Sequence, residues 1–317
     1  MVDVIPNFDD VRQAARRIAP YVHRTPIFTS RTLDELTSAT LYFKAENLQK
    51  VGAFKARGAC NAVFALSEAE AARGVATHSS GNHAQAVAYA AGLREIPATV
   101  VMPESAPPVK VAAVRDYGAE IVWAGSRPLD RERKLEAVLA ETGAHFIHPS
   151  NDPPVIAGQG TAALELVEEI TTLDIVMAPV GGGGLLAGTA LAVAGQAPAA
   201  RVIGAEPAAV DDAARSLQEG RIHPPTGAPT VADGLCTFLG DVNFPIIQEH
   251  VSDIVTVSEQ AIVEAMRLIW ERMKLLIEPS SAVPLAALFE HPALGRGQRV
   301  GIILSGGNVD VTHLPWM

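Results

Sequence analysis

Four consecutive glycines, Gly181, Gly182, Gly183 and Gly184, follow an apolar segment that ends at Pro179. A stretch without side chains lets backbone N–H groups approach a dianion, and a helix that begins directly after it adds unpaired N–H groups and the positive end of its dipole. The pattern therefore predicts a strand, a phosphate-binding loop and a helix. Its spacing matches neither of the common glycine-rich nucleotide motifs, so the ligand stays open at this point. A tight turn whose glycines only permit close packing is the alternative interpretation.

Composition narrows the class of protein. The chain has 317 residues, 48% of them hydrophobic and 5% aromatic, which predicts a large aliphatic core divided between two lobes. The formal net charge of −10 argues against nucleic acid or an acidic membrane as the main partner, because both require clustered Lys and Arg. The segment from Met1 to Asn7 lacks the pattern of a signal peptide, and no apolar stretch reaches membrane-spanning length. A cytoplasmic enzyme is expected.

The cysteines carry little chemistry in this interpretation. Cys60 and Cys236 are too few for a disulfide framework or a multi-cysteine metal site. We expect both to be buried small hydrophobic residues.

Strand-like and helix-like segments alternate along most of the chain, which predicts an α/β fold with mostly parallel sheets flanked by helices. A first helix is expected to be capped by Asn7 and to end near Pro20. The compact alternation of residues 74–149 predicts a small substrate-binding domain, and residues 1–73 and 150–317 a large domain, with a cleft between them. The predicted strands are Thr40–Phe43, Gly74–His78, Ala98–Met102, Glu120–Trp123, His145–His148, Ile175–Pro179, Val202–Glu206, Ile254–Val257 and Val300–Ser305.

Lys55 stands at the predicted start of a helix that runs through Phe64. Position alone favours a solvated surface lysine, because most lysines are exposed. Two polar turns at strand ends, around Asn82 and Ser305, accompany the lysine and the glycine loop. This set suits pyridoxal phosphate, because an amine whose pKa is lowered by apolar surroundings and a helix dipole forms a Schiff base with an aldehyde.

With these residues in view, the chain resembles the fold type II pyridoxal-phosphate enzymes, and among them the serine racemase and serine/threonine dehydratase family. The resemblance covers essentially the whole chain. It implies a fold like that of the tryptophan synthase β subunit, with the cofactor in the cleft between the lobes. The motifs that carry it are Glu46–Lys50, Ala53–Ala59, Thr77–His83, Val155–Thr161, Pro179–Gly184, Trp270–Lys274 and Ser305–Asp310.

The resemblance implies a role for each matching residue. Lys55 would hold the cofactor covalently, with Phe54 against the ring, Asn82 on the ring hydroxyl and Ser305 facing the pyridine nitrogen. The four glycines would bind the phosphate. A neutral hydroxyl does not keep the ring nitrogen protonated, so the ring is a weaker electron sink, which favours β-elimination. The substrate carboxylate would be bound by hydroxyl, amide and backbone N–H groups of Ser79, Asn82 and His83.

Ser80 bears on the choice between racemisation and elimination. If Lys55 takes the α-proton on one face, a hydroxyl on the opposite face can return a proton and invert the centre. Racemases of the family carry serine at the position of Ser80, and biosynthetic threonine dehydratases usually carry alanine. The hydroxyaspartate dehydratases also carry serine there, so this residue leaves both activities open.

Glu206 and Asp212 flank a predicted strand-to-helix connection. By themselves these acids are typical of a helix start, where the dipole favours negative charge. The resemblance implies instead that both carboxylates and the carbonyl of Val210 bind Mg²⁺, Ca²⁺ or Mn²⁺. It also implies a homodimer, and it raises ATP as an activator because ATP stimulates some relatives.

The leading hypothesis is a serine racemase that also converts serine and threonine to pyruvate or 2-oxobutanoate and ammonia. The alternatives within the family are a threo-3-hydroxyaspartate ammonia-lyase that yields oxaloacetate, and a catabolic L-threonine dehydratase. The alternative from a different class is a non-catalytic protein that binds a phosphometabolite through the glycine loop alone.

Overall fold

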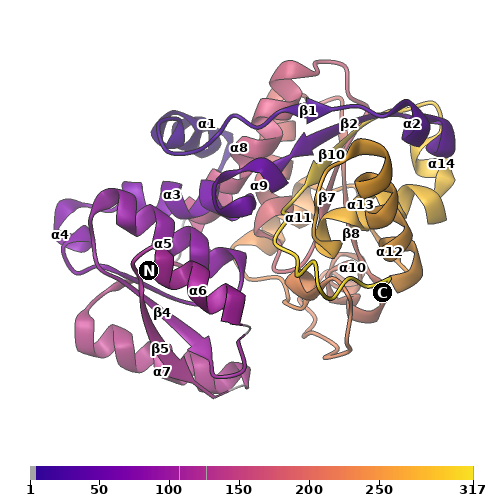
Figure 1. Ribbon diagram of the computed structural model, residues 1–317. Coiled ribbons are helices and arrows are strands. Elements are labelled where there is room, and N and C mark those ends of the chain that lie inside the picture. The colour runs from indigo at the N-terminus through magenta and orange to yellow at the C-terminus, as the bar shows by residue number, and fades with distance from the viewer. Residues whose placement is uncertain (1–4, 107, 126, 317) are drawn as a thin grey trace.

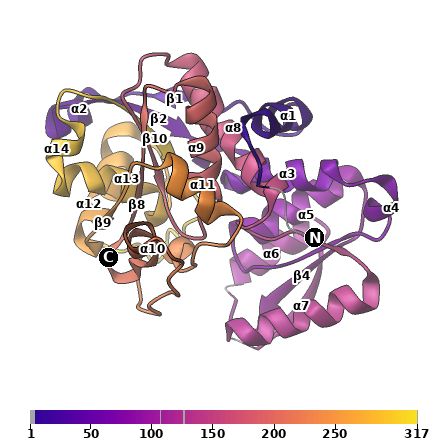
Figure 2. The same cartoon turned by 180° about the vertical axis from the view of Figure 1, so that it is seen from behind.

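In the part of the chain that the structure describes, ten strands form two sheets. Figures 1 and 2 show from opposite sides how helices cover both sheets. The computed structural model describes residues 5–106, 108–125 and 127–316. The strands are β1 (Ile27–Phe28), β2 (Thr40–Ala45), β3 (Val75–His78), β4 (Ala98–Pro103), β5 (Glu120–Ala124), β6 (His145–Phe146), β7 (Ile175–Pro179), β8 (Arg201–Pro207), β9 (Asp253–Val257) and β10 (Arg299–Leu304).

The helices connect these strands in chain order. They are α1 (Phe8–Ile18), α2 (Arg31–Thr37), α3 (Lys55–Ala65), α4 (Glu68–Ala71), α5 (Asn82–Arg94), α6 (Pro108–Asp116), α7 (Pro128–Thr142), α8 (Pro153–Glu169), α9 (Gly184–Gln196), α10 (Asp212–Glu219), α11 (Asn243–His250), α12 (Glu259–Leu268), α13 (Pro279–Glu290) and α14 (Pro292–Gly295). Short non-α turns are η1 (Glu46–Leu48), η2 (Lys50–Gly52), η3 (Ala208–Val210), η4 (Asp233–Leu235) and η5 (Ile269–Met273).

The larger sheet has six strands in the order β1-β2-β10-β7-β8-β9, and all neighbours are parallel except β1, which pairs antiparallel with β2. Its central strand β7 is buried at every residue, as expected for a parallel strand covered on both faces. Alternate side chains of β7 enter two cores. Val176 and Ala178 pack with α8, α9 and α11, and Ile175 and Met177 pack with α12 and α13.

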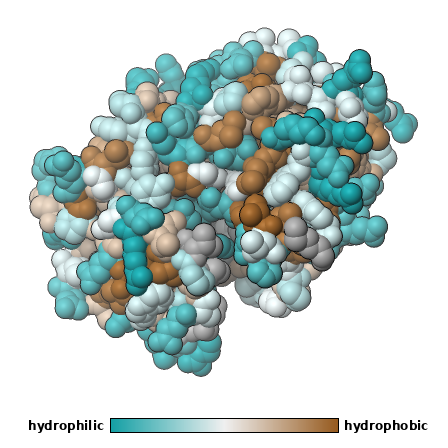
Figure 3. All heavy atoms as spheres, viewed as in Figure 1, coloured by the Kyte–Doolittle hydropathy of each residue, from teal (hydrophilic) through white to brown (hydrophobic). Residues whose placement is uncertain are grey.

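The smaller sheet has four parallel strands in the order β5-β4-β3-β6. Along β4, Val100 and Met102 pack against α5 and α6, and Val101 packs on the opposite face with residues of α7. This α/β architecture with two mostly parallel sheets is the predicted fold class. Figure 3 shows an indentation of the surface where the two sheet-and-helix units meet.

Local signals predicted the first helix correctly. Asn7 Oδ1 accepts the N–H groups of Asp9 and Asp10 at 2.8 and 3.4 Å, and Asp10 Oδ2 accepts the N–H of Asn7 at 2.8 Å. This reciprocal capping box satisfies donors that have no partner inside the helix. The helix ends at Ile18, two residues before Pro20.

Two details differ from the sequence analysis. Every predicted strand is present, but the two-residue edge strand β1 was not predicted, because it is too short to show a period. The prediction that both cysteines are buried is wrong for one of them. Cys60 is buried, whereas Cys236 is exposed, as are Thr237 and Phe238 after it in the connection that follows η4.

The site residues follow the carboxyl ends of parallel strands. Ser305 follows β10, the glycine loop follows β7, and Ser79 follows β3. Ligands of open α/β sheets gather at this edge. Among the described residues, no helix combines the length and apolar character that crossing a membrane requires.

Candidate active site

Lys55 is the first residue of α3, and its side chain is directed to the end of the smaller sheet. Lys55 Nζ donates to the carbonyl of Pro149 at 2.7 Å and lies 5.0 Å from the centre of the Phe54 ring. Burial lowers the pKa of Lys55 to about 8, and the carboxylate of Glu278 partly opposes this shift. The uncharged, nucleophilic form of the Lys55 amine is therefore more accessible near neutral pH than that of an exposed lysine.

The backbone before Lys55 is joined to the loop that follows β10. The Phe54 N–H donates to the Ser305 carbonyl at 2.9 Å, and the Gly307 N–H donates to the Gly52 carbonyl at 2.9 Å. These bonds place Ser305 next to the start of α3. Lys55 and Ser305, which are far apart in the sequence, therefore reach one site because the loop after β10 lies against the start of α3.

The glycine loop has no room for side chains. Gly183 has a φ of +80°, a conformation that residues with a Cβ rarely adopt, and it directly precedes α9. A Cβ on Gly183 would lie 2.7 Å from Asn243 Oδ1, and one on Gly184 would lie 2.8 Å from the Ser150 carbonyl oxygen. The loop thus presents bare backbone at a helix N-terminus, which fits the phosphate of pyridoxal phosphate.

Asn82 is held between two residues of the larger unit. Its Nδ2 donates to the carboxylate oxygens of Glu278 at 3.0 and 3.1 Å, and its Oδ1 accepts from Asn308 Nδ2 at 2.9 Å. Burial raises the pKa of Glu278 to about 7. These contacts fix the orientation of the Asn82 amide from both sides.

Ser305 lies in a small hydroxyl network. Its Oγ is 3.1 Å from Ser281 Oγ, which also donates to the Gly306 carbonyl and accepts the Gly306 N–H, both at 2.7 Å. Since Ser281 uses its own proton on that carbonyl, Ser305 is the donor of the pair.

The turn before α5 carries the predicted carboxylate-binding residues. Its N-cap, Gly81, has no side chain to satisfy the first N–H groups of the helix, so these groups remain available to an anion. Ser79 Oγ accepts the Gly81 N–H at 3.2 Å, and Ser80 is half-buried with no hydrogen bond from its hydroxyl to any described residue.

The His83 side chain is directed away from that turn. It is buried, its Nε2 lies 3.0 Å from the Ile147 carbonyl oxygen, and burial lowers its pKa well below the usual value. The neutral ring therefore carries its proton on Nε2 and donates to this carbonyl. Any contact of His83 with a substrate carboxylate would come from its backbone N–H.

The three predicted metal-site residues lie close together in the chain's fold. Glu206 lies in β8, Val210 ends η3 and Asp212 begins α10. Glu206 Oε1 accepts the N–H of Ala214 at 2.6 Å. Burial raises the pKa of Glu206 to about 8 and that of Asp212 to about 6, and each repels its acidic neighbours.

The buried Oδ2 of Asp212 has no hydrogen-bond partner among the described residues. No group of three or more His, Cys, Asp or Glu side chains is arranged for a metal in the described part of the chain. Two buried carboxyl groups and a carbonyl nevertheless suit a hard divalent cation that keeps water ligands.

Sequence reasoning missed several residues that complete the site. Glu278 was missed because an acid before a proline at a helix start is read as an ordinary cap. Pro149, Ser150 and Asn243 belong to no motif, since their contacts join segments distant in the sequence. Asn308 lies in the motif Ser305–Asp310, and this position could have suggested a role for it.

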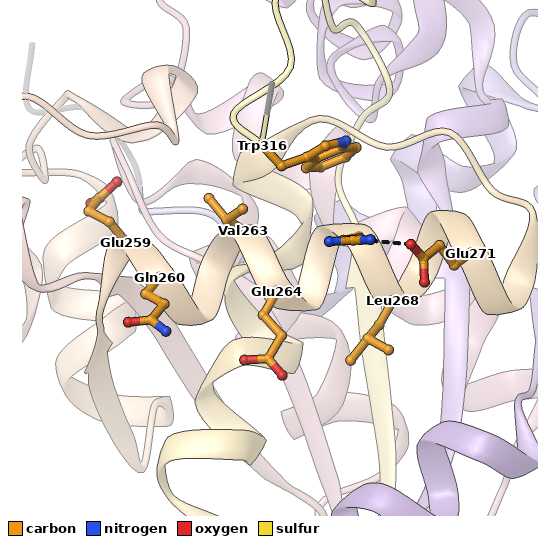
Figure 4. Close-up of a pocket in the computed structure, with 8 residues that line it drawn as sticks. Glu259, Gln260, Val263, Glu264, Leu268, Glu271 and Trp316 are labelled. Carbon is orange, nitrogen blue, oxygen red and sulfur yellow. Dashed lines mark hydrogen bonds and ion pairs between the residues drawn. The ribbon is translucent and has the colours of Figure 1, made fainter.

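A separate surface groove lies outside the candidate site. It runs along α12 under the Trp316 ring and contains no predicted site residue (Figure 4). Its ion pair joins Arg267 Nε to Glu271 Oε1 at 2.7 Å, with both side chains about half exposed. The groove is a feature of the outer surface of the larger unit.

Comparison with known proteins agrees with this geometry. Residues 18–306 match the profile of the family described as pyridoxal-phosphate dependent enzyme. The chain therefore belongs to the pyridoxal-phosphate-dependent enzymes. Its two-sheet architecture is that of fold type II, which confirms the predicted class and cofactor.

Three relatives illustrate the similarity. The chain is 53% identical over 312 residues to a beta-hydroxyaspartate dehydratase of Paracoccus denitrificans, covering 98% of this chain and 99% of the relative. It is 46% identical to the serine racemase of Dictyostelium discoideum, whose crystal structure superposes with a TM-score of 0.93 over 97% of this chain and 100% of the other. It is 51% identical to a threonine deaminase from T.th., whose crystal structure superposes with a TM-score of 0.91 over 96% of this chain and 99% of the other.

Proposed function

We propose that the chain is a serine racemase that also eliminates water from serine and threonine, giving pyruvate or 2-oxobutanoate and ammonia. The observation that carries the proposal is the Lys55 amine, with its pKa lowered to about 8, beside a cradle of bare backbone. The names of relatives support it, because they include a serine racemase and a threonine deaminase.

Lys55 and Ser80 have different roles in the proposed reaction. Pyridoxal phosphate, when bound, supplies an aldehyde for the amino group and a ring that delocalises the charge left by the departing α-proton. Lys55 would accept that proton on one face of the substrate. The Ser80 hydroxyl, which has no partner among the described residues, would return one from the other face.

The substrate is a small hydroxy amino acid in this proposal. The N–H groups at the start of α5, with Ser79 and Asn82, would bind its carboxylate. In the elimination branch, the α-proton goes to Lys55 and the β-hydroxyl leaves with a proton as water. Hydrolysis of the resulting enamine gives the keto acid and ammonia.

The remaining assignments support this activity. We assign residues 74–149 to a substrate-binding domain and the rest to a cofactor-binding domain, with Phe54 against the ring and Ser305 at its nitrogen. Mg²⁺, or Ca²⁺ or Mn²⁺ in its place, would bind Glu206, Asp212 and the Val210 carbonyl as a structural ion, since both carboxyl groups are buried and burial raises their pKa values. A cytoplasmic homodimer and stimulation by ATP remain proposals from the resemblance.

A second candidate is a 3-hydroxyaspartate ammonia-lyase. It is favoured by the dehydratase of Paracoccus denitrificans at 53% identity. A second substrate carboxylate needs a cation. Burial lowers the pKa of His78, and the nearby Arg131 guanidinium adds to this shift. Arg131 Nε is buried without a partner among the described residues, and a guanidinium donor of this kind suits a carboxylate.

Replacing Lys55 with Ala tests the shared core of both candidates. Because the amine is both the anchor of the cofactor and the base, Lys55→Ala should abolish racemisation and elimination together with the visible absorption of bound cofactor. Lys134→Ala, an exposed lysine of α7, is the matched control and should leave both unchanged. Retention of the visible band in Lys55→Ala would refute the assignment.

A substrate panel separates the candidates. We would measure kcat/KM for L-serine, L-threonine and the diastereomers of 3-hydroxyaspartate, with chiral analysis of the remaining serine. Formation of D-serine at a rate comparable to pyruvate supports the racemase. A preference of about 100-fold or more for a hydroxyaspartate, with no D-serine, would replace it with the ammonia-lyase.

A further inference from the structure

Parts of three sequence motifs have no role in the proposed reaction, and the structure brings them together. They are Glu46 in the segment Glu46–Lys50, Arg57 in Ala53–Ala59 and Thr161 in Val155–Thr161. The side chains of Arg57 and Glu46 are fully buried. Arg57 Nε donates to Glu46 Oε2 at 2.7 Å, and its Nη2 donates to Glu46 Oε1 at 2.8 Å. A lysine cannot form this paired geometry, because it lacks the planar fork.

A second carboxylate and a lysine complete the cluster. Arg57 Nη1 donates to Glu165 Oε1 at 2.7 Å and to Thr161 Oγ1 at 3.2 Å. Lys44 Nζ donates to Glu165 Oε2 at 2.5 Å. The arginine cluster, formed by Lys44, Glu46, Arg57 and Glu165, thus pairs two positive with two negative groups. Removing one partner from a buried ion pair is costly, so the cluster holds its members in one arrangement.

The arginine cluster ties the helix that carries Lys55 to the larger unit. Lys44 comes from β2, Glu46 from η1 and Glu165 from α8. Arg57 is the third residue of α3 and therefore belongs to its first turn. Three elements of the larger unit thus hold one side of this turn.

Backbone contact restricts the same turn. Gly58 donates its N–H to Gln159 Oε1 of α8 at 3.1 Å. A Cβ on Gly158 would lie 2.6 Å from the Gly58 Cα, so the two helices touch without side chains between them. The charged hydrogen bonds of Arg57 lie beside this contact, where they oppose rotation of α3 against α8.

Lys55 and Arg57 lie on opposite sides of the turn, because two residues of an α-helix span about 200°. Lys55 Nζ reaches the Pro149 carbonyl at 2.7 Å, at the end of the smaller sheet. A rotation of α3 about its axis would therefore displace the amine. Misplacing a reacting group by about 1 Å can cost about 100-fold in rate.

We propose that Arg57 is a positioning residue: through Glu46 and Glu165 it sets the rotation of the first turn of α3, and with it the place of the Lys55 amine at the substrate α-carbon. Arg57 acts through the backbone of α3, since its side-chain hydrogen bonds go to the arginine cluster, Thr161 and the His23 carbonyl. The inference rests on the proposed function, in which Lys55 moves the α-proton.

The test is Arg57→Lys, which keeps the positive charge and loses the planar fork. In the holoenzyme, NMR in D₂O follows exchange of the α-hydrogen of L-serine, the step assigned to Lys55. The limiting exchange rate should fall about tenfold or more, because the base is misplaced. KM should stay within about twofold, since the substrate-binding turn before α5 is unchanged.

Rates are divided by the amount of bound cofactor, which the visible absorption of the lysine-bound form measures. A loss of folded protein therefore does not imitate the effect.

Arg94→Lys is the matched control, because it makes the same change near the other end of α3. Arg94 Nη1 donates to the Val63 carbonyl, and its Nη2 donates to Glu68 at 2.8 Å. Both variants lose hydrogen bonds to or beside α3, so both should lower the denaturation midpoint. Only Arg57→Lys should lower the exchange rate per bound cofactor.

Glu165→Gln is a second, milder variant that leaves Arg57 paired with Glu46. It should lower the exchange rate in the same direction by about threefold, again with KM unchanged. This variant tests the inference if Arg57→Lys does not fold.

Two results would overturn the inference. A wild-type exchange rate per bound cofactor in the cluster variants, or an equal loss in Arg94→Lys, means that the arginine cluster only stabilises the fold, while the proposed function still stands. Wild-type protein that binds pyridoxal phosphate and exchanges no α-hydrogen removes the proposed function and this inference together.

Discussion

At the scale of single residues, burial sets the chemistry. The same desolvation that lowers the pKa of the Lys55 amine to about 8 raises that of the Glu278 carboxyl to about 7. Burial therefore favours the uncharged form of both the amine and the carboxyl group in this site. Ser80 is the contrasting case, because its hydroxyl is half-buried and unpaired among the described residues, so it remains available to a substrate.

Ser80→Ala should separate the two proposed activities. Loss of the hydroxyl removes the proton donor on the face opposite Lys55, so racemisation should fall about 100-fold or more. Elimination from L-serine needs only Lys55 and should stay within a few-fold of wild type. Chiral chromatography of serine and a coupled pyruvate assay measure the two rates. An equal loss of both would show that Ser80 has another role.

At the scale of elements, helix N-termini supply the anion-binding groups. The starts of α5 and α9 are both preceded by glycine without a side-chain cap. Their unpaired N–H groups are thereby left for the substrate carboxylate and the cofactor phosphate. The start of α10 is different, because the Glu206 carboxylate accepts its N–H groups. Asp212 Oδ2, at the same helix start, has no partner among the described residues.

Gly182→Ala tests the glycine loop as an element. The added methyl group collides with Ser150 Oγ and lies 3.1 Å from Thr237 Oγ1, so the loop must shift at a cost of about 1–3 kcal/mol. We expect weaker cofactor binding in equilibrium dialysis and a lower denaturation midpoint. Gly92→Ala, within α5, is the control, because its Cβ would meet only the Tyr117 carbonyl oxygen at 3.3 Å, and it should cost less and leave cofactor binding unchanged. Similar losses in both variants would contradict a special role for the loop.

The proposed metal site predicts a link between pH and stability. Glu206 and Asp212 hold their protons more tightly in the folded than in the unfolded chain. Without a cation, the folded state should therefore lose stability as pH rises through their unfolded values towards about 8. Mg²⁺ binds the deprotonated carboxylates, so it should reverse this loss.

After chelation, Mg²⁺ in about 100-fold excess over its Kd should raise Tm by about 5 °C at about pH 8 and by less at about pH 5.5. Thermal unfolding at both pH values measures the effect. Asp212→Asn should abolish the response to Mg²⁺. An equal response in that variant would place the ion elsewhere.

At the scale of the whole molecule, the site is shared by two sheets. Asn82 belongs to a helix of the smaller unit, while Glu278 and Asn308 belong to the larger one. A second link, from Lys110 Nζ in α6 to Asp233 Oδ2 in η4, spans 3.1 Å and is partly exposed. The Asn82–Glu278 bond ends on a buried carboxyl group, whereas the Lys110–Asp233 pair is partly exposed and screened by solvent.

These two links should differ in their contribution to stability. Lys110→Met should change the free energy of unfolding by less than about 1 kcal/mol, because exposed ion pairs are screened by solvent. Glu278→Ala should cost about 1–3 kcal/mol, since it leaves the Asn82 amide without its acceptor in a buried position. Urea denaturation of cofactor-free protein measures both. A larger loss in Lys110→Met would reverse this assignment.

The class of fold, the glycine loop and the place of Lys55 at a helix start could be predicted from the sequence. These features follow from local periodicity, from residues without side chains and from spacing along one chain. The residues that surround them could not be predicted, because they come from distant segments that meet only in the folded chain. The Pro149 carbonyl reaches Lys55, and Glu278 and Asn308 hold Asn82, because parallel strands distant in the sequence end at one edge. Burial likewise depends on packing between segments that are distant in the sequence. Local patterns therefore could not show that Cys60 is buried and Cys236 exposed.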